Sequence, residues 1–96
     1  MLSFLPKNPS EMMQELKSRF KARRRSLGYT QKELSTRAGV SLGSLKRFEG
    51  SGRIALESLL KLALVLECLE DFEKICLETE KKFESIDEIL SEERST

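Results

Sequence analysis

Apolar positions recur along the chain at helical spacing, and helix-start and helix-end signals divide them into segments. The first segment opens with Asn8 and Pro9, a capping residue followed by one that suits the first helical position. Its apolar positions recur as far as Leu27, and Gly28 ends it. Since no run alternates with the period of two that a strand requires, the pattern predicts an all-helical protein.

Two short helices are predicted between residues 30 and 49. Thr30 and Glu33 have the spacing of a capping box, which starts the first of them. Gly39 breaks that helix, Ser41 is a good cap for the next one, and residues 50–52 close it. The inner sides of the two helices are marked by Leu34, Ala38, Leu45 and Phe48.

A fourth helix, residues 56–66, is apolar on more than one side, so it needs more than one neighbour. The stripe expected to face the protein's own core consists of Leu56, Leu59, Leu60, Ala63 and Leu66. The second stripe faces another helix or a second subunit. We expect a two-fold dimer interface built from Leu62, Val65, Leu69 and Phe72.

Beyond this helix, residues 70–82 carry apolar side chains at helical spacing among acids. Residues 68–70 are compatible with either a bend or a continuous helix. Ser85 and Glu88 form another capping-box pattern, which opens a short helix through Leu90, and residues 92–96 read as a frayed end.

Charge is divided unevenly between the two halves of the chain. The first 53 residues hold twelve basic and four acidic side chains, a net charge of +8, and the remainder carries −7, which leaves +1 for the whole chain. Such asymmetry indicates a polyanionic partner for the first half. The alternative is that two solvated faces of opposite sign attract each other.

Residue types that serve active sites and metal sites are scarce. The chain has no histidine, and its two cysteines, Cys68 and Cys76, would lie about 12 Å apart on one continuous helix, too far for a disulfide. We interpret them as small apolar residues of a helical core, in a protein of the reducing cytoplasm. The apolar run at residues 59–69 contains Lys61 and Glu67, which argues against a membrane span. No enzyme activity, metal or cofactor is therefore expected.

Residues 30–49 meet three requirements of a helix-turn-helix: a sharp bend, an apolar residue beneath both helices, and a cap for the second helix. Gly39, Val40 and Ser41 supply them in turn. Over residues 13–67 the chain resembles the phage-repressor-like (Cro/C1, or XRE) helix-turn-helix family. The resemblance rests on Arg24-x-x-Leu27-Gly28-Tyr29-Thr30-Gln31-x-Glu33-Leu34, on Ala38-Gly39-Val40-Ser41-x-x-x-Leu45-x-x-Phe48-Glu49-Gly50, and on Ala55-Leu56-Glu-Ser-Leu59-Leu60-Lys-Leu62-Ala63.

This resemblance implies an all-α, lambda-repressor-like fold, a compact bundle of about five helices with a C-terminal helical extension. Three regions follow from it and from the charge division. Residues 1–8 are a flexible arm, residues 9–67 a helix-turn-helix DNA-binding domain, and residues 68–96 an acidic C-terminal helical extension.

The resemblance also implies which side chains meet DNA, with the helix at residues 41–49 in the major groove. The residues expected there are Gln31, Ser41, Leu42, Gly43, Ser44, Lys46, Arg47 and Arg53. Gln31 would contact a phosphate and brace the third helix. Arg24 and Glu49 would form an interhelical ion pair, and the alternative for Arg24 is a solvated basic face.

Physical chemistry adds an independent reading of these residues. Arg47 has the fork geometry that matches guanine O6 and N7. Leu42 either touches a thymine methyl group or is an additional core residue. Gly43 costs about 1 kcal/mol relative to alanine inside a helix, which indicates close approach of the backbone to DNA or tolerated drift. For Arg23 and Arg25 on the first helix, a solvated face is favoured over phosphate contact.

One recognition helix reads only about four to six base pairs, so a homodimer that reads half-sites about 34 Å apart is expected. The run Val40–Glu49 and the leucine-rich helix after it are also similar to the antitoxins that accompany HipA-type kinase toxins. That similarity implies a toxin protein as a further partner, held by the acidic residues 70–93. The competing class is a protein-interaction module with little DNA binding of its own. We therefore predict a transcriptional regulator of a prokaryotic cytoplasm, a dimeric repressor that binds double-stranded DNA.

Overall fold

The computed structural model describes residues 8–78, which form four α-helices and one 3-10 helix. Their bounds are Pro9–Ser26 for α1, Gln31–Ala38 for α2, Leu42–Ser51 for α3, Leu56–Val65 for α4 and Leu69–Lys74 for η2. No strand occurs in this part of the chain. The predicted all-helical bundle of about five helices is confirmed. None of the described helices is long and apolar enough to cross a membrane.

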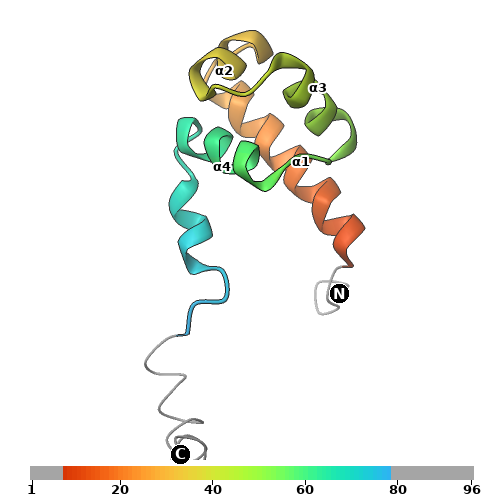
Figure 1. Ribbon diagram of the computed structural model, residues 1–96, viewed down its shortest axis with the longest axis vertical. Coiled ribbons are helices and arrows are strands. Elements are labelled where there is room, and N and C mark those ends of the chain that lie inside the picture. Colours follow the sequence, from red (N-terminus) through yellow and green to blue (C-terminus); the bar gives the residue numbers. More distant parts are fainter. Residues whose placement is uncertain (1–7, 79–96) are drawn as a thin grey trace, which may run out of the picture.

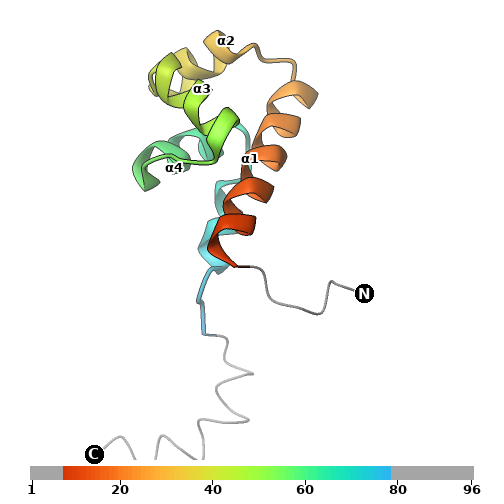
Figure 2. The same cartoon turned by 90° about the vertical axis from the view of Figure 1, so that its right-hand side faces the viewer.

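α1 runs along one side of the molecule and packs against α3 (Figures 1 and 2). α2 and α3 lie together at one end, and α4 packs against α2. η2 extends from α4 toward the opposite end (Figure 1). The arrangement therefore leaves α2 and α3 together at one end of the molecule.

Local sequence signals explain where the first helices begin and end. The Asn8 side chain accepts a hydrogen bond from the Glu11 amide at 2.7 Å, and Pro9 occupies the first helical turn. At the other end of α1, the Tyr29 amide donates to the carbonyl of Arg24 at 3.1 Å. This bond satisfies a carbonyl that the last helical turn leaves without a partner.

The turn between α2 and α3 is short, and side-chain caps mark the start of each helix. Thr30 and Glu33 form the predicted capping box at the start of α2, with bonds of 2.9 and 3.0 Å. Gly39 ends α2 in the left-handed region at φ 72°, which a side chain would disfavour. Ser41 then caps α3 by accepting the Ser44 amide at 3.1 Å. Three residues thus redirect the chain between the two helices.

The core lies where the four α-helices meet. It is formed by Phe20, Leu34, Val40, Leu45, Phe48, Leu59, Leu62, Ala63 and Leu66. Phe20 of α1 and Phe48 of α3 meet edge to face with their ring centroids 5.6 Å apart, a favoured aromatic geometry. Val40 of the turn is buried beneath α2 and α3, as the helix-turn-helix pattern requires.

Side chains of α1 close the C-terminal end of α3. The Gln14 amide donates to the carbonyl of Ser51 at 3.0 Å, and the Lys17 ammonium donates to that of Gly50 at 3.2 Å. The last carbonyls of a helix lack intrahelical partners and carry partial negative charge, so a lysine is favourable there. At Gly52 a side chain would come within 3.0 Å of an α1 backbone oxygen. α1 and the end of α3 are therefore in close contact.

Arg23 closes the C-terminal end of α4 in the same way. Its guanidinium donates from Nε to the carbonyl of Leu66 at 2.9 Å and from Nη2 to that of Glu67 at 3.1 Å. Arg23 is exposed, as expected for a solvated face, but its guanidinium is also bonded to the end of α4. A residue 43 positions earlier in the sequence serves as the helix cap.

The buried side of α4 differs from the stripe expected from its sequence. Leu62 is fully buried, and Leu56 is 67 % exposed. Since Leu62 faces the core of its own chain, assigning it to a dimer interface is wrong. Val65, Leu69 and Phe72 are partly buried against that same core. Periodicity alone could not distinguish the core-facing stripe from the one beside it, because both are apolar.

An apolar stripe remains on the outer face of α4. It consists of Leu56, Leu60 and Leu64, spaced four residues apart. Leu56 and Leu64 are both about two-thirds exposed, and Leu60 is half-buried. The ion pair of Glu57 and Lys61, at 3.5 Å, lies on the same helix. Large apolar side chains this exposed at regular spacing mark a surface that a partner could cover.

The chain bends after α4. Glu67 adopts the left-handed region at φ 62°, so helical geometry stops there, and η2 follows as a separate 3-10 helix. Of the alternatives at residues 68–70, the bend is correct. Phe72 packs back on the core, with its ring centroid 6.5 Å from that of Phe20. Apolar side chains recur at helical spacing over residues 70–82, but within the described residues helical geometry ends at Lys74.

Several predicted features lie outside the described residues. They are the arm up to Lys7, the helix opened by Ser85 and Glu88, and the frayed end at residues 92–96. The division of the chain at residue 67 stays a prediction.

Candidate nucleic-acid interface

One face of α3 is open to solvent and carries no acidic side chain. It is formed by Gly43, Lys46, Arg47 and Gly50, which follow one another at helical spacing and are all exposed. The opposite face, with Leu45, Phe48 and Glu49, is buried. Because that buried face fixes the rotation of the helix, the two cations point away from the protein.

The other residues expected at DNA lie near this face with different exposures. Ser41 and Arg53 are exposed, and Leu42 and Ser44 are half-buried. Ser41 holds the start of α3, since its hydroxyl accepts the Ser44 amide and donates to the Ser44 hydroxyl at 3.0 Å. Leu42 is therefore neither a full core residue nor a fully exposed one.

Gly43 has no structural reason to be glycine within the described part of this chain. A Cβ atom built on it has nothing within 4 Å, and its backbone is helical. Gly50, further along the same helix, is equally open. Because glycine destabilises a helix relative to alanine, the bare backbone at residue 43 suits a surface that something else approaches closely.

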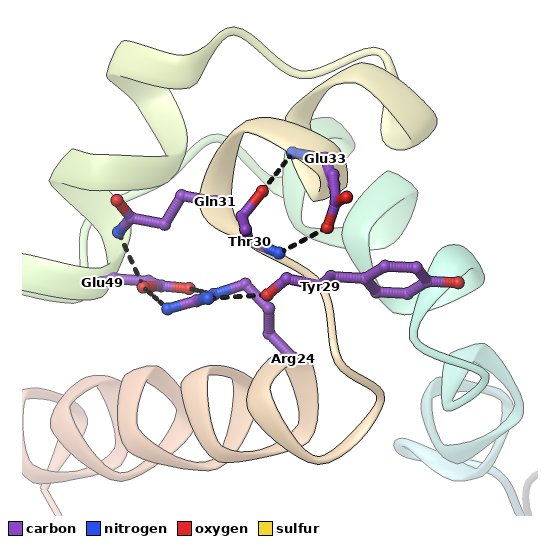
Figure 3. A network of polar contacts seen from close by, with 6 residues as sticks. All are labelled: Arg24, Tyr29, Thr30, Gln31, Glu33 and Glu49. Atoms are coloured by element: carbon purple, nitrogen blue, oxygen red, sulfur yellow. Dashed lines mark hydrogen bonds and ion pairs between the residues drawn. The ribbon is translucent and has the colours of Figure 1, made fainter.

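A buried polar network ties α2 and α3 to α1 (Figure 3). The Arg24 guanidinium makes two bonds to the Glu49 carboxylate, at 2.8 and 3.0 Å, and a third to the carbonyl of Tyr29 at 2.8 Å. The Gln31 amide donates to the same carboxylate at 2.9 Å. The structure therefore contains the ion pair of Arg24 and Glu49 and joins Gln31 to it, so Gln31 does brace the third helix.

The partners of Glu49 favour the ionised form of its carboxyl group. Burial of this side chain would raise its pKa, but the hydrogen bonds from Arg24 and Gln31, with the nearby positive charges of Arg24 and Lys21, outweigh burial and lower it. In the part of the chain that the structure describes, every fully buried side-chain nitrogen and oxygen has a hydrogen-bond partner. The network is thus complete, which is the condition under which buried ions hold elements in one arrangement.

Comparison with known families identifies the arrangement. A family model described as helix-turn-helix matches residues 20–72, more than half of the chain. The chain belongs to the Cro/C1-type helix-turn-helix family. It is thus a DNA-binding protein of the regulator type. Neither the curated proteins nor the solved structures gave a match.

Within the helix-turn-helix, charge favours an anionic partner. Residues 30–53 contain five cationic side chains, Lys32, Arg37, Lys46, Arg47 and Arg53, all of them exposed. The two carboxylates in that range, Glu33 and Glu49, are held in the capping box and in the ion pair. The surface around α2 and α3 therefore presents mostly positive charge, which neutralises DNA phosphates.

Two of these cations were missed in the sequence analysis. Lys32 and Arg37 lie on α2, and the Arg37 guanidinium is 5.0 Å from the centre of the Tyr29 ring, within reach of a cation–π contact. The signal that could have found them was their place in the basic half, on the helix that precedes the turn. Among residues 8–78 no three His, Cys, Asp or Glu side chains are grouped closely enough to hold a metal ion.

Proposed function

We propose that this helix-turn-helix protein is a dimeric repressor of a prokaryotic cytoplasm that reads the major groove with α3. The observation that supports the proposal is the open face of α3, where two cations and two glycines stand without an acidic neighbour. A helix of this size fits the major groove, and its N-terminal part is the one that reaches base edges in this class of motif.

Base reading falls to Arg47, Lys46 and Ser44. The Arg47 guanidinium can donate two parallel hydrogen bonds to guanine O6 and N7, a geometry that lysine lacks. Lys46 supplies a single cationic donor, and Ser44 can donate or accept. Leu42 reaches a thymine methyl group with the part of its side chain that remains exposed. Gly43 allows the backbone of α3 to come close to the floor of the groove.

Phosphate contacts set the position of α3. Gln31 has two amide hydrogens, of which one is bonded to Glu49, so the other is free for a phosphate oxygen. Ser41 precedes α3 and Arg53 follows it in the chain, and both are exposed and can contact the backbone of the duplex. Such contacts give affinity without sequence information and fix the register of the helix.

The dimer is proposed to form through the outer stripe of α4, because Leu62 lies in the core. Leu56 and Leu64 are the most exposed large apolar side chains among the described residues. Two copies that bury this stripe present two α3 helices to successive turns of the major groove, as a palindromic operator requires. The expected spacing of the half-sites is about 34 Å.

Binding to the DNA upstream of the protein's own gene tests the function. Specific binding of full-length protein should weaken as salt rises, by about 0.9 log unit per log unit of salt for each phosphate contact. Arg47→Ala should cost about 1–3 kcal/mol on the preferred site and reduce discrimination at one base pair. Arg19→Ala is the matched control, since it removes the same charge from an exposed side chain of α1, outside the helix-turn-helix.

Two outcomes contradict this proposal. If Arg47→Ala weakens all sequences equally, Arg47 contacts a phosphate and the reading of guanine is wrong. If the wild-type protein shows no salt-dependent binding, the protein-interaction module is the better description.

A toxin protein as a further partner rests on the similarity to antitoxins of HipA-type kinases. The acidic side chains after α4 would provide the surface for it, and most of them lie outside the described residues. Co-expression with the product of the neighbouring gene, followed by pull-down on a tagged copy of this chain, tests the idea. Absence of a complex, together with a neighbour that does not impair growth, removes it.

A further inference from the structure

A groove of about 520 Å³ lies between α1 and η2. η2 itself lies toward the end of the molecule away from α2 (Figures 1 and 2). The apolar lining of the groove consists of Met12, Leu16, Phe20, Cys68, Phe72 and Ile75. Arg19, Arg23 and Asp71 also line it. A mostly apolar groove with a few charged side chains is the usual form of a site for a small amphipathic ligand or segment.

The chain leaves the described region beside this groove. Ile75, which lines it, is 61 % exposed, and the last described residue, Glu78, comes three positions later. Eighteen further residues, 79–96, follow. Phe83 is eight residues beyond Ile75, which an extended chain spans with at most about 29 Å. The end of the chain is thus tethered within reach of the groove, at an effective concentration of order millimolar.

The sequence of this segment fits an apolar groove. Its apolar residues are Phe83, Ile86, Ile89 and Leu90. Their spacings of three, three and one place most of them on one side of a helix, and the capping-box pattern of Ser85 and Glu88 lies among them. The other positions are mostly charged. The segment is therefore amphipathic, with an apolar side that matches the lining of the groove.

Charge favours the same pairing. Residues 79–96 carry six acidic and three basic side chains, a net charge of −3. The groove is lined by two arginines and one aspartate, and one of the arginines, Arg19, also forms an ion pair with Glu15. Arg23 makes its hydrogen bonds to backbone carbonyls, so within residues 8–78 no carboxylate forms an ion pair with it. An acidic segment in the groove would supply that missing negative charge, and Asp71 opposes it with one charge of the same sign.

We propose that the acidic segment Phe83–Leu90 of the same chain lies in the groove between α1 and η2, with its apolar side on the groove lining and its carboxylates toward Arg19 and Arg23. The segment then covers Cys68 and leaves α3 free, because no residue of α3 lines the groove. Part of the negative charge of the second half of the chain is then paired with positive charge of the first half. The positive charge of α3 stays available for DNA.

Reaction of the Cys68 thiol with a disulfide reagent such as DTNB tests the proposal in the full-length chain. Cys76→Ser removes the other cysteine, so that a single thiol reports on the groove. Because burial raises the pKa of the Cys68 thiol, the reaction is followed at alkaline pH. The rate is compared between this parent protein, Phe83→Asp, Ile86→Asp and the matched control Leu77→Asp. Leu77 is an exposed apolar residue that does not line the groove.

Rates should rise in Phe83→Asp and Ile86→Asp and remain unchanged in Leu77→Asp. A segment docked for about four-fifths of the time slows the thiol about fivefold, so release should speed the reaction by that factor. DNA affinity and helical circular dichroism should stay unchanged in all variants, which separates undocking from unfolding. Equal rates in parent and variants overturn the proposal. A difference that grows with protein concentration also overturns it, because the segment then fills the groove of a second copy.

Discussion

The fold does not require glycine at position 43. Substitution of Gly43 can therefore separate an effect on stability from an effect on DNA binding. Gly43→Ala should raise the free energy of unfolding by about 0.5–1 kcal/mol, because alanine is the better helix former and the added Cβ meets nothing in the protein. The same variant should weaken DNA binding several-fold, since the methyl group intrudes where the backbone approaches DNA. Urea unfolding and a titration with operator DNA measure the two effects.

Gly50→Ala is the control for that experiment. It lies on the same exposed face of α3 with the same open space, but in the last turn, one turn beyond Arg47, where the proposed docking places it further from the bases. Its stability should rise by a similar amount while its affinity stays close to wild type. Equal losses of affinity from both glycines would show that α3 does not enter the groove with its N-terminal part leading.

Arg23 has a structural role that its sequence position does not indicate, because it caps the end of α4. We expect Arg23→Ala to lower the free energy of unfolding by about 1–2 kcal/mol, because two charge-assisted hydrogen bonds to the end of α4 are lost. Arg25→Ala, an exposed neighbour with no side-chain hydrogen bond among the described residues, should stay within about 0.5 kcal/mol of wild type. Thermal or urea unfolding compares them. Equal effects would mean that the cap contributes nothing beyond the charge of α1.

At the scale of elements, the starts of three helices were predictable, because the capping residues and the amides they bind are close in the sequence. Asn8, Thr30 and Ser41 each cap a helix through a bond to an amide three residues away, so the sequence alone suffices. The cap on α4 was not predictable, since it joins residues that only tertiary packing brings together. The side of α4 that faces the core was misplaced for a related reason. Leu56 and Leu62 are equally apolar, and only the packing of α2 on α4 decides which is buried.

Glu49 joins α1, α2 and α3, and its contribution to the free energy of unfolding should decrease at acidic pH. The pKa of this carboxyl is lowered in the folded protein, so its contribution to stability is present above the unfolded value of about 4.3 and is lost as pH falls through the folded value. Glu49→Gln should cost about 3 kcal/mol at pH 7, because Arg24 remains buried without its counter-ion. The difference between the two proteins should shrink as the pH is lowered below about 4.

Urea unfolding at neutral and acidic pH measures this difference, and Glu57→Gln is its control. Glu57 pairs with Lys61 on the exposed face of α4, where an ion pair contributes little. Its substitution should change stability by less than about 0.5 kcal/mol at either pH. A gap between wild type and Glu49→Gln that stays constant with pH would show that the shape of the side chain matters and its charge does not.

For the whole molecule, the outer stripe of α4 sets the expected assembly. Leu64→Glu should convert the dimer to a monomer at micromolar concentration and reduce operator affinity, since two linked α3 helices bind far more tightly than one. The fold should tolerate the change, because Leu64 is 64 % exposed. Light scattering and operator titration give both results. Leu77→Glu is the control, since Leu77 is similarly exposed but lies outside the stripe, and this variant should remain dimeric. A wild-type protein that is monomeric would contradict the proposed dimer.

The part of the candidate site that lies on α3 was predictable, because its residues belong to one continuous segment. Lys46, Arg47 and Ser44 lie together because they share a helix whose inner face is set by Leu45 and Phe48. The second amphipathic surface of the molecule, the groove between α1 and η2, could not be predicted. It exists because the chain bends at Glu67, a residue that normally avoids the left-handed region.

The pairing of Arg24 with Glu49 restricts how this sequence can change over time. Loss of either partner strands the other charge inside the protein, whereas two apolar residues of similar volume in their place would be tolerated. Related sequences should therefore keep both or replace both together. Since Gln31 is bonded to the same carboxylate, a double replacement would free its amide as well. The proposed contact of Gln31 with a phosphate would then change through the substitution of two buried residues.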